Sequence, residues 1–309
     1  MEKHKILIAG LPDTGKSTFI GALWAIVRNY SDVIKSKMKA SDSDVPDLVE
    51  KLDNLGEAWE CVRYIKRSSE DIPENMRIEL VTADEEIGVT LDFPDFRGES
   101  FRNIISQNQP KTIDDWCEHA DSLLFFINDF KSGTFYDDIK DFEEDNDLNK
   151  NRFNQPGLSP ELMTPATQNM LILRYLKGHS HFKKVTICIT QWDRYVKIHS
   201  TNKKMKSPEV VLQKQSPALY NFIKYHFPQA TFYGLSSQGD EYKYEQQTDE
   251  QKKNDEKLVK ADCKKRLLEW GKKGQRAFIC WEKEYSFDIT SLIYNMLSLL
   301  SNKKRQFDL

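Results

Sequence analysis

A short apolar run followed by a glycine-rich turn constrains the fold of this chain more than any other feature. The run is KILIA, residues 5–9, and the turn is GLPDTGKS, residues 10–17. A continuous apolar run of this length is typical of a strand buried on both faces of a parallel sheet. Residues 17–30 then place apolar side chains at helical intervals. The sequence therefore predicts a strand, a loop and a helix in immediate succession.

The remaining apolar segments alternate between strand-like runs and helical patterns. The strand-like runs are residues 76–82, 88–93, 122–127, 185–190 and 230–235, and the helical patterns are residues 46–66, 162–177, 210–227 and 289–300. The acidic turn ADEEIG between the first two runs predicts a hairpin. This alternation predicts an α/β domain with a doubly wound, mostly parallel sheet that includes one antiparallel strand.

Three charged or irregular segments do not fit this core pattern. They are residues 31–75, 131–160 and 238–275, and we interpret them as insertions into a single domain that spans residues 1–309. The second and third are rich in acidic and basic residues, a composition typical of solvated helices or loops. The alternative is that they form a surface that binds a partner protein.

The overall charge excludes a general attraction to anionic polymers. The chain has 45 basic and 48 acidic residues, a formal net charge of −3, so no global positive field recruits nucleic acid or an anionic membrane. No apolar run approaches the roughly 20 residues of a membrane span. The five cysteines lack metal-ligand or redox spacing. We therefore expect a cytoplasmic protein with reduced thiols and no membrane segment.

The glycine-rich turn has the full spacing of a phosphate-binding loop, with Gly10, four further residues, then Gly15, Lys16 and Ser17. The glycines allow the backbone amides to curl toward phosphate oxygens, and the following helix adds its positive N-terminal end. Lys16 would reach the terminal phosphates, and the Ser17 hydroxyl would bind Mg²⁺. Neighbouring residues are expected to contribute through their backbone amides: Asp13, Thr14 and Thr18.

A second motif, DFRG, follows the strand-like run 88–93. Asp95 stands at the expected end of that strand, and Gly98 follows three residues later. An aspartate at this place can hold Mg²⁺ through water, and the Gly98 amide can bind a phosphate group that exists only before hydrolysis. We therefore expect Asp95 to act as a metal ligand and Gly98 as part of the catalytic machinery.

A third motif, TQWD, comes directly after the strand-like run 185–190. The carboxylate of Asp193 can accept hydrogen bonds from N1 and the exocyclic amino group of guanine, a pair of donors that adenine lacks. Thr190 and Gln191 would complete this base-binding element, and the alternative role for Asp193 is to cap the next helix. After the last core strand, Ser236 and Ser237 lie where a backbone amide could meet the guanine carbonyl.

The order of these motifs resembles that of Ras-like (TRAFAC-class) P-loop GTPases. GLPDTGKS and DFRG match the phosphate and switch motifs, TQWD stands in place of Asn-Lys-x-Asp, and LSSQ in place of Ser-Ala-Lys. The resemblance, over roughly residues 5–237, implies the three-layer αβα sandwich of P-loop NTPases with Ras-like topology. It also implies GTP or GDP with Mg²⁺ as ligands, and GTP hydrolysis that switches a partner protein.

The first twenty residues of the motif region, KILIAGLPDTGKSTFIGALW, also resemble the double-GTPases of bacterial conflict systems. That narrower resemblance implies a partner, which would be a second GTPase, a second copy of this chain, or another effector or activating protein.

Departures from the Ras-like pattern predict weak or slow activity. Gln191 replaces a lysine whose stem packs over the base, so we expect modest guanine affinity. Glu99 stands where these proteins carry the glutamine that orients the attacking water, and its charge would repel the γ-phosphate. Arg97 could offset transition-state charge or meet a partner. We therefore expect slow intrinsic hydrolysis.

The first switch segment lacks its usual Mg²⁺ ligand. No threonine occurs between residues 31 and 75, and Ser68 and Ser69 are the best-placed hydroxyls. Two rival functions remain open on sequence grounds. One is an ATPase or small-molecule kinase that uses the same loop, and the other is a catalytically inactive module that holds nucleotide for assembly.

Overall fold

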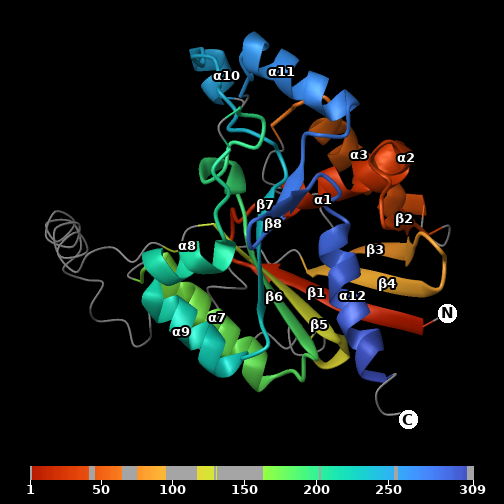
Figure 1. Cartoon of the computed structure of the whole chain (residues 1–309). Helices are drawn as coiled ribbons and strands as arrows, with labels where there is room; N and C mark the ends of the chain where they lie inside the picture. Colours follow the sequence, from red (N-terminus) through yellow and green to blue (C-terminus); the bar gives the residue numbers. More distant parts are fainter. Residues whose placement is uncertain are drawn as a thin grey trace, which may run out of the picture.

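The phosphate-loop strand lies at the centre of a mixed sheet in the computed structural model (Figure 1). β1 (Glu2–Gly10) pairs in parallel with β4 (Ile87–Pro94) on one side and with β5 (Ser122–Ile127) on the other. β6 (Lys184–Ile189) and β7 (Thr231–Ser236) continue the parallel part. The structure describes residues 2–41, 46–64, 75–94, 117–128, 130, 163–201, 203–253 and 257–304.

Antiparallel strands extend the sheet at both sides. β3 (Asn75–Thr82) forms the predicted hairpin with β4, and β2 (Met38–Ala40) pairs with β3. On the far side, β8 (Phe278–Trp281) pairs with β7, and β9 (Glu284–Ser286) with β8. The predicted mostly parallel sheet is confirmed. Besides β3, however, β8 also runs against the parallel strands, which the sequence did not reveal.

Helices cover both faces of the sheet because successive residues of β1 point to opposite sides. Ile6 and Ile8 face one core and Leu7 and Ala9 the other. The first face carries α1 (Lys16–Ala25), a π-helical extension (Ile26–Tyr30), α2 (Ser31–Ile34), α3 (Pro46–Glu60) and α12 (Ser291–Lys304). Together with the helices of the other face, they form the predicted three-layer αβα sandwich (Figure 1).

The second face carries α7 (Pro165–Gly178), α8 (Pro208–Gln215) and α9 (Pro217–His226). The sequence predicts one helix over residues 210–227, whereas the structure has two. The break falls at Ser216, where the backbone is extended (φ −145°, ψ 71°) because the residue before a proline is disfavoured in the helical region.

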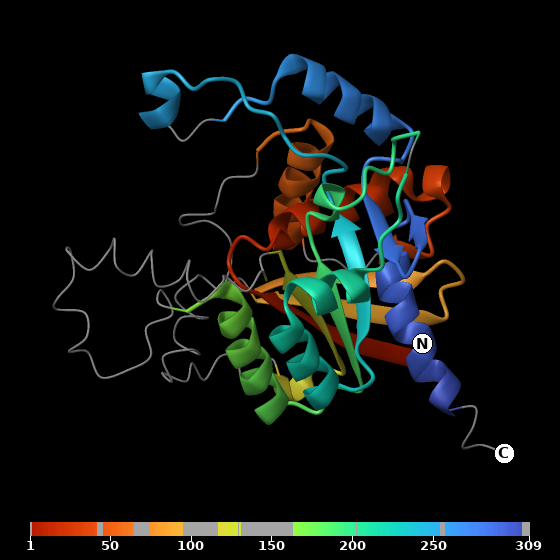
Figure 2. The ribbon, with the colours of Figure 1, turned by 60° about the vertical axis from the view of Figure 1, so that its left-hand side comes forward.

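A smaller layer lies beyond the end of α3. It contains α10 (Asp249–Lys253) and α11 (Ala261–Lys272), and Figures 1 and 2 both place α11 over the end of α3. Tyr242, Cys263 and Leu267 form a separate apolar cluster there with Val62. The predicted helix 46–66 ends at Glu60, since Val62 has a positive φ of 53° that cannot continue it.

No helix in the described part of the chain combines the length and the apolar content needed to cross a lipid bilayer.

Candidate nucleotide-binding site

The candidate motifs gather at one edge of the sheet. β1, β5, β6 and β7 are parallel neighbours, so their carboxyl ends lie side by side. The phosphate loop follows β1, Asn128 follows β5, the TQWD segment follows β6 and the SSQG segment ends β7. Ligands of open α/β sheets bind at this edge.

The backbone of the phosphate loop depends on two glycines. A Cβ atom at Gly10 would lie 2.4 Å from the carbonyl oxygen of Phe126, so only glycine lets the loop leave β1 this close to β5. Gly15 has a φ of 82° and stands directly before α1, and Asp13 also has a positive φ, 63°. Alternation of left- and right-handed residues turns successive amides toward one point, as in anion-binding nests.

The side chains of the loop place a positive charge inside this curve. The buried Thr14 hydroxyl donates to the Leu11 carbonyl at 2.8 Å. The ammonium group of Lys16 donates to the carbonyls of Gly10 and Leu11, both at 2.9 Å. Apart from its neighbours in the chain, no atom of the described residues lies within 4 Å of a Cβ position built on Gly15. An ammonium group, a helix N-terminus and open space beside the backbone fit a phosphate group.

Ser17 and Thr18 lie in the first turn of α1 and are partly exposed. Ser17 thus stands beside the loop at the start of α1, and its role as a Mg²⁺ ligand stays a prediction. Asn128 was not singled out from the sequence. Its Nδ2 donates to the carbonyl of Asp13 at 2.7 Å and ties the phosphate loop to the end of β5. The available signal was an amide side chain directly after a buried strand at the same edge.

The TQWD segment begins with Thr190, whose amide donates to the Ile127 carbonyl at 2.8 Å. Gln191 turns the chain with a φ of 53°, and its Oε1 is buried without a hydrogen-bond partner among the described residues. A short 3₁₀ helix, η4 (Trp192–Arg194), then carries Asp193, which is 6% exposed. The indole of Trp192 lies on Gly234, where an added Cβ would come within 2.2 Å of the ring.

Asp193 is held by the next strand. The Ser236 hydroxyl donates to Oδ1 of Asp193 at 2.6 Å, and the Gly239 amide donates to the Ser236 oxygen at 2.9 Å. Burial raises the pKa of Asp193, while the bond from Ser236 acts in the opposite direction. Gln191 is the cap residue of η4, so the helix-cap alternative for Asp193 gains no support from its contacts. The structure thus joins two residues that the sequence identified separately.

The carbonyls of the loop after β7 are also fixed. The Trp59 indole donates to the Ser237 carbonyl at 2.6 Å, and Nε of Arg276 donates to the Gln238 carbonyl at 3.2 Å. Neither Trp59 nor Arg276 belongs to a motif that the sequence singled out. Trp59 is buried, and no local pattern signals a bond between residues 178 positions apart.

Several predicted residues lie outside the described residues: Ser68, Ser69, Asp95, Arg97, Gly98 and Glu99. Their proposed metal-binding and catalytic roles therefore remain predictions. β4 ends at Pro94, and its parallel register with β1 runs up to the pair Leu7 and Asp92. The chain thus leaves β4 toward the edge that carries the phosphate loop.

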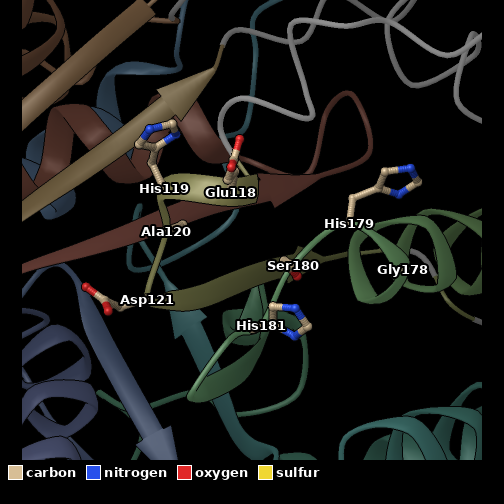
Figure 3. A pocket seen from close by; sticks show the side chains of 8 residues that line it. All are labelled: Glu118, His119, Ala120, Asp121, Gly178, His179, Ser180 and His181. Atoms are coloured by element: carbon tan, nitrogen blue, oxygen red, sulfur yellow. The ribbon is translucent and has the colours of Figure 1, made fainter.

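A hollow of about 450 Å³ lies at the opposite edge, where β5 and β6 begin (Figure 3). Its lining includes His119, His179, His181, Glu118 and Asp121. Figure 3 shows the three imidazole rings pointing in different directions. Among the described residues, no group of three or more histidine, cysteine, aspartate or glutamate side chains could hold a metal ion. This hollow is separate from the candidate nucleotide site.

A phosphate loop after β1, a buried aspartate after β6 and a serine at the end of β7, all at one sheet edge, define a phosphate-loop nucleotide-binding domain. The model of the Double-GTPase 1 family matches residues 7–296. The chain belongs to this family and is a GTP-binding GTPase domain, which confirms the resemblance predicted from the motifs. No curated protein matches the sequence.

Solved structures of other GTPases are similar at low identity. A bacterial selenocysteine-specific elongation factor, EF-Sec, is 12% identical, with 77% of this chain and 26% of that chain covered (TM-score 0.33). Aquifex aeolicus Era bound to GDP·AlF4⁻ is 14% identical, with 77% and 52% covered (TM-score 0.31). The G domain of the T. maritima FeoB iron transporter is 13% identical, with 76% and 89% covered (TM-score 0.29). This chain thus spans about a quarter of EF-Sec and half of Era.

Proposed function

We propose that this chain binds GTP with Mg²⁺, hydrolyses it slowly, and thereby switches a partner protein. The observation that carries the guanine part is the buried Asp193, held by Ser236 at the same sheet edge as the phosphate loop. A carboxylate with one oxygen engaged by a hydroxyl retains acceptor capacity for the N1–H and amino group of guanine. Burial strengthens such bonds because water does not compete for the donors.

The phosphate part rests on Lys16 and the loop amides. The Lys16 ammonium already lies within the curve of the loop, where it would attract the terminal phosphates and offset the charge that grows on them during hydrolysis. Ser17 is the described hydroxyl that would hold Mg²⁺, with Asp95 and Ser69 or Ser68 as the proposed further ligands. Bound Mg²⁺ would supply positive charge to the phosphate oxygens.

Hydrolysis is proposed to be slow because the water-positioning group is Glu99 in place of glutamine. A carboxylate can accept a proton from water, but it repels the phosphate unless a cation offsets its charge. Arg97 would supply that cation from within the chain, and Gly98 would bind the γ-phosphate. A second GTPase or a second copy of the chain is the proposed partner, in keeping with the resemblance to double-GTPases.

The test compares the binding of GDP, GTP, ADP and ATP to the wild-type chain by calorimetry, and follows phosphate release with Mg²⁺ and with excess chelator. We expect guanine nucleotides to bind more tightly than adenine nucleotides, and Mg²⁺-dependent release above the solvent background. Equal affinity for all four nucleotides, or a preference for ATP, would replace this proposal with an ATPase or kinase. If guanine nucleotides bind selectively but phosphate release stays at the solvent background, the chain would instead be a catalytically inactive module that holds nucleotide for assembly.

A further inference from the structure

Arg276 is a charged residue that lies beside the loop after β7, the loop that follows Ser236. It precedes β8 and is only 1% exposed. Its guanidinium group donates from Nε to the Gln238 carbonyl at 3.2 Å, from Nη1 to the Trp59 carbonyl and from Nη2 to the Tyr242 hydroxyl. One rigid fork therefore binds three oxygens from two segments, the end of α3 and the loop after β7.

Stability alone gives a poor account of this residue. Its hydrogen-bond partners among the described residues are carbonyl and phenol oxygens, and burial lowers the pKa of the guanidinium group. A buried cation without a carboxylate partner is costly, and apolar side chains of similar volume often stabilise a core better. The arrangement is more useful for fixing the end of α3 against the loop after β7 than for adding stability.

Trp59 completes the contact with the loop. The guanidinium carbon of Arg276 lies 4.4 Å from the centre of the Trp59 ring, a cation–π distance. The indole N–H of the same Trp59 donates to the Ser237 carbonyl. The stacked pair thus holds two consecutive carbonyls, those of Ser237 and Gln238.

The same loop reaches the guanine-binding carboxylate. Gly239 has a φ of 85°, and a Cβ there would lie 2.3 Å from the carbonyl oxygen of Arg276, so the loop turns directly against this residue. The Gly239 amide donates to Ser236, and Ser236 donates to Asp193. A continuous series of short contacts therefore leads from the guanidinium group to Asp193.

We propose that Arg276, together with Trp59, is a positioning residue for guanine recognition. It touches no nucleotide itself. By fixing the carbonyls of Ser237 and Gln238 it sets the place of Ser236, which orients Asp193 toward the base. This inference rests on the proposed guanine binding at Asp193, and it adds a determinant of base selectivity that lies outside the nucleotide motifs.

The test uses the full chain and the variants Arg276→Lys and Trp59→Phe. Lysine keeps the charge but lacks the fork, and phenylalanine keeps an aromatic face but lacks the N–H donor. The matched control is Arg28→Lys, because Arg28 lies in the π-helical extension of α1 and also stacks on a tryptophan, Trp24 (5.1 Å), but is itself exposed. Affinities for GDP, inosine diphosphate and ADP are measured by calorimetry, with thermal unfolding as the check on folding.

We expect each positioning variant to weaken GDP binding about tenfold. This is the loss expected when one hydrogen bond between guanine and the charged Asp193 carboxylate is lost. ADP binding should change by less than about twofold, because the phosphate loop is intact. Inosine lacks the exocyclic amino group, so the preference for GDP over inosine diphosphate should shrink as well. The control should retain the wild-type ratios.

A merely structural role makes a different prediction, namely that all three affinities fall together with the unfolding temperature. That result, or unchanged GDP:ADP ratios in both variants, would overturn the inference. If Arg276→Lys does not fold, Trp59→Phe carries the same readout. Failure of the proposed function is distinguishable, since the wild type itself would then show no preference for guanine.

Discussion

The phosphate loop and the base-recognition loop lie at the same sheet edge but are held in different ways. The side chains of Lys16 and Thr14 make hydrogen bonds within their own loop, to residues two to six positions away. The base-recognition contacts join Asp193 with Ser236, 43 positions apart, and the following loop with Trp59, 178 positions apart. The first element combines these local bonds with one exposed bond from Asn128, whereas the second is built from buried contacts between distant segments.

This difference suggests that phosphate binding and base recognition depend on different parts of the molecule, the first mainly on the loop backbone and the second on side chains. The phosphate loop is formed by β1, two glycines and the start of α1, with β5 beside it, and none of these parts would distinguish one base from another. In the proposed function, discrimination between bases would depend on the side-chain contacts among α3, η4, β7 and Arg276, which lies two residues before β8. Substitutions at the two ends should therefore produce two distinct patterns of loss.

The largest effect is expected for Lys16→Ala. Removal of the ammonium group should weaken GTP and ATP alike by about a hundredfold or more, because charge-assisted bonds to phosphate are among the strongest in such sites. The fold should persist, since Lys16 is only partly buried, belongs to neither core, and donates to carbonyls at the edge of the sheet. Calorimetry and thermal unfolding measure both effects, with Lys214→Ala at the end of α8 as the control. Tight triphosphate binding by the Lys16 variant would show that the phosphate-loop assignment is wrong.

Asp193→Asn should lower GTP affinity about tenfold to a hundredfold and leave ATP affinity unchanged. This is the loss expected when the guanine donors no longer meet a buried carboxylate acceptor. Xanthine offers N1–H and a carbonyl in place of the amino group, so xanthosine triphosphate should bind the asparagine variant better than the wild type. Competition binding with the three triphosphates measures this exchange. A parallel loss of GTP and ATP would contradict the separation of the two ends.

Ser236→Ala should have a smaller, pH-dependent effect. Burial raises the pKa of Asp193 and the bond from Ser236 opposes this rise, so loss of the hydroxyl should raise the pKa further. Guanine donors need the ionised carboxylate, and GDP affinity should therefore decline on acidification at a higher pH in the variant than in the wild type. Titrations over roughly pH 5 to 8 would show the displaced profile. Identical profiles would mean that Ser236 does not tune Asp193, and ADP serves as the internal control.

The same shift has a consequence for nucleotide-free stability. A carboxyl group whose folded pKa is raised binds its proton more readily in the folded than in the unfolded chain. Its contribution to stability is therefore lost as the pH rises from the ordinary value through the folded value. Asparagine does not titrate, so Asp193→Asn has no such loss. The unfolding temperature of the variant should therefore rise relative to that of the wild type as the pH increases over that window.

The smallest effect is expected for Asn128→Ala. Its bond to the Asp13 carbonyl is exposed, so its loss should weaken GDP and ADP together by about twofold to fivefold. Calorimetry with both nucleotides tests this. A loss confined to GDP would place Asn128 with the base-recognition end instead of the phosphate loop.

The sequence predicted the parts of this molecule that local patterns determine. The spacing of Gly10, Gly15 and Lys16 identified the phosphate loop, and the apolar runs identified the parallel strands. β2, β8 and β9 were missed because strands of three or four residues show no period. Proline at position 217 was available as a signal for the break between α8 and α9, but the continuous apolar pattern concealed it.

The base-recognition end was predicted only in part, for a physical reason. A carboxylate after a buried strand indicated Asp193, but its bond to Ser236 and the roles of Trp59 and Arg276 depend on tertiary packing. Trp59 lies on the apolar face of the predicted helix 46–66. That pattern predicts its burial but not the hydrogen bond from its indole N–H to the Ser237 carbonyl. Arg276 resembled any other basic residue near a charged segment.

The described sheet ends at both sides in strands of only three residues, β2 and β9. Unpaired edges are the usual template for strand addition and for open-ended stacking of copies into fibrils. An incoming strand would find few free N–H and C=O groups here, with the exposed Lys39 and Glu284 at the two margins. We therefore expect a proposed partner, whether a second GTPase or a second copy, to contact helices and loops and not to extend the described sheet.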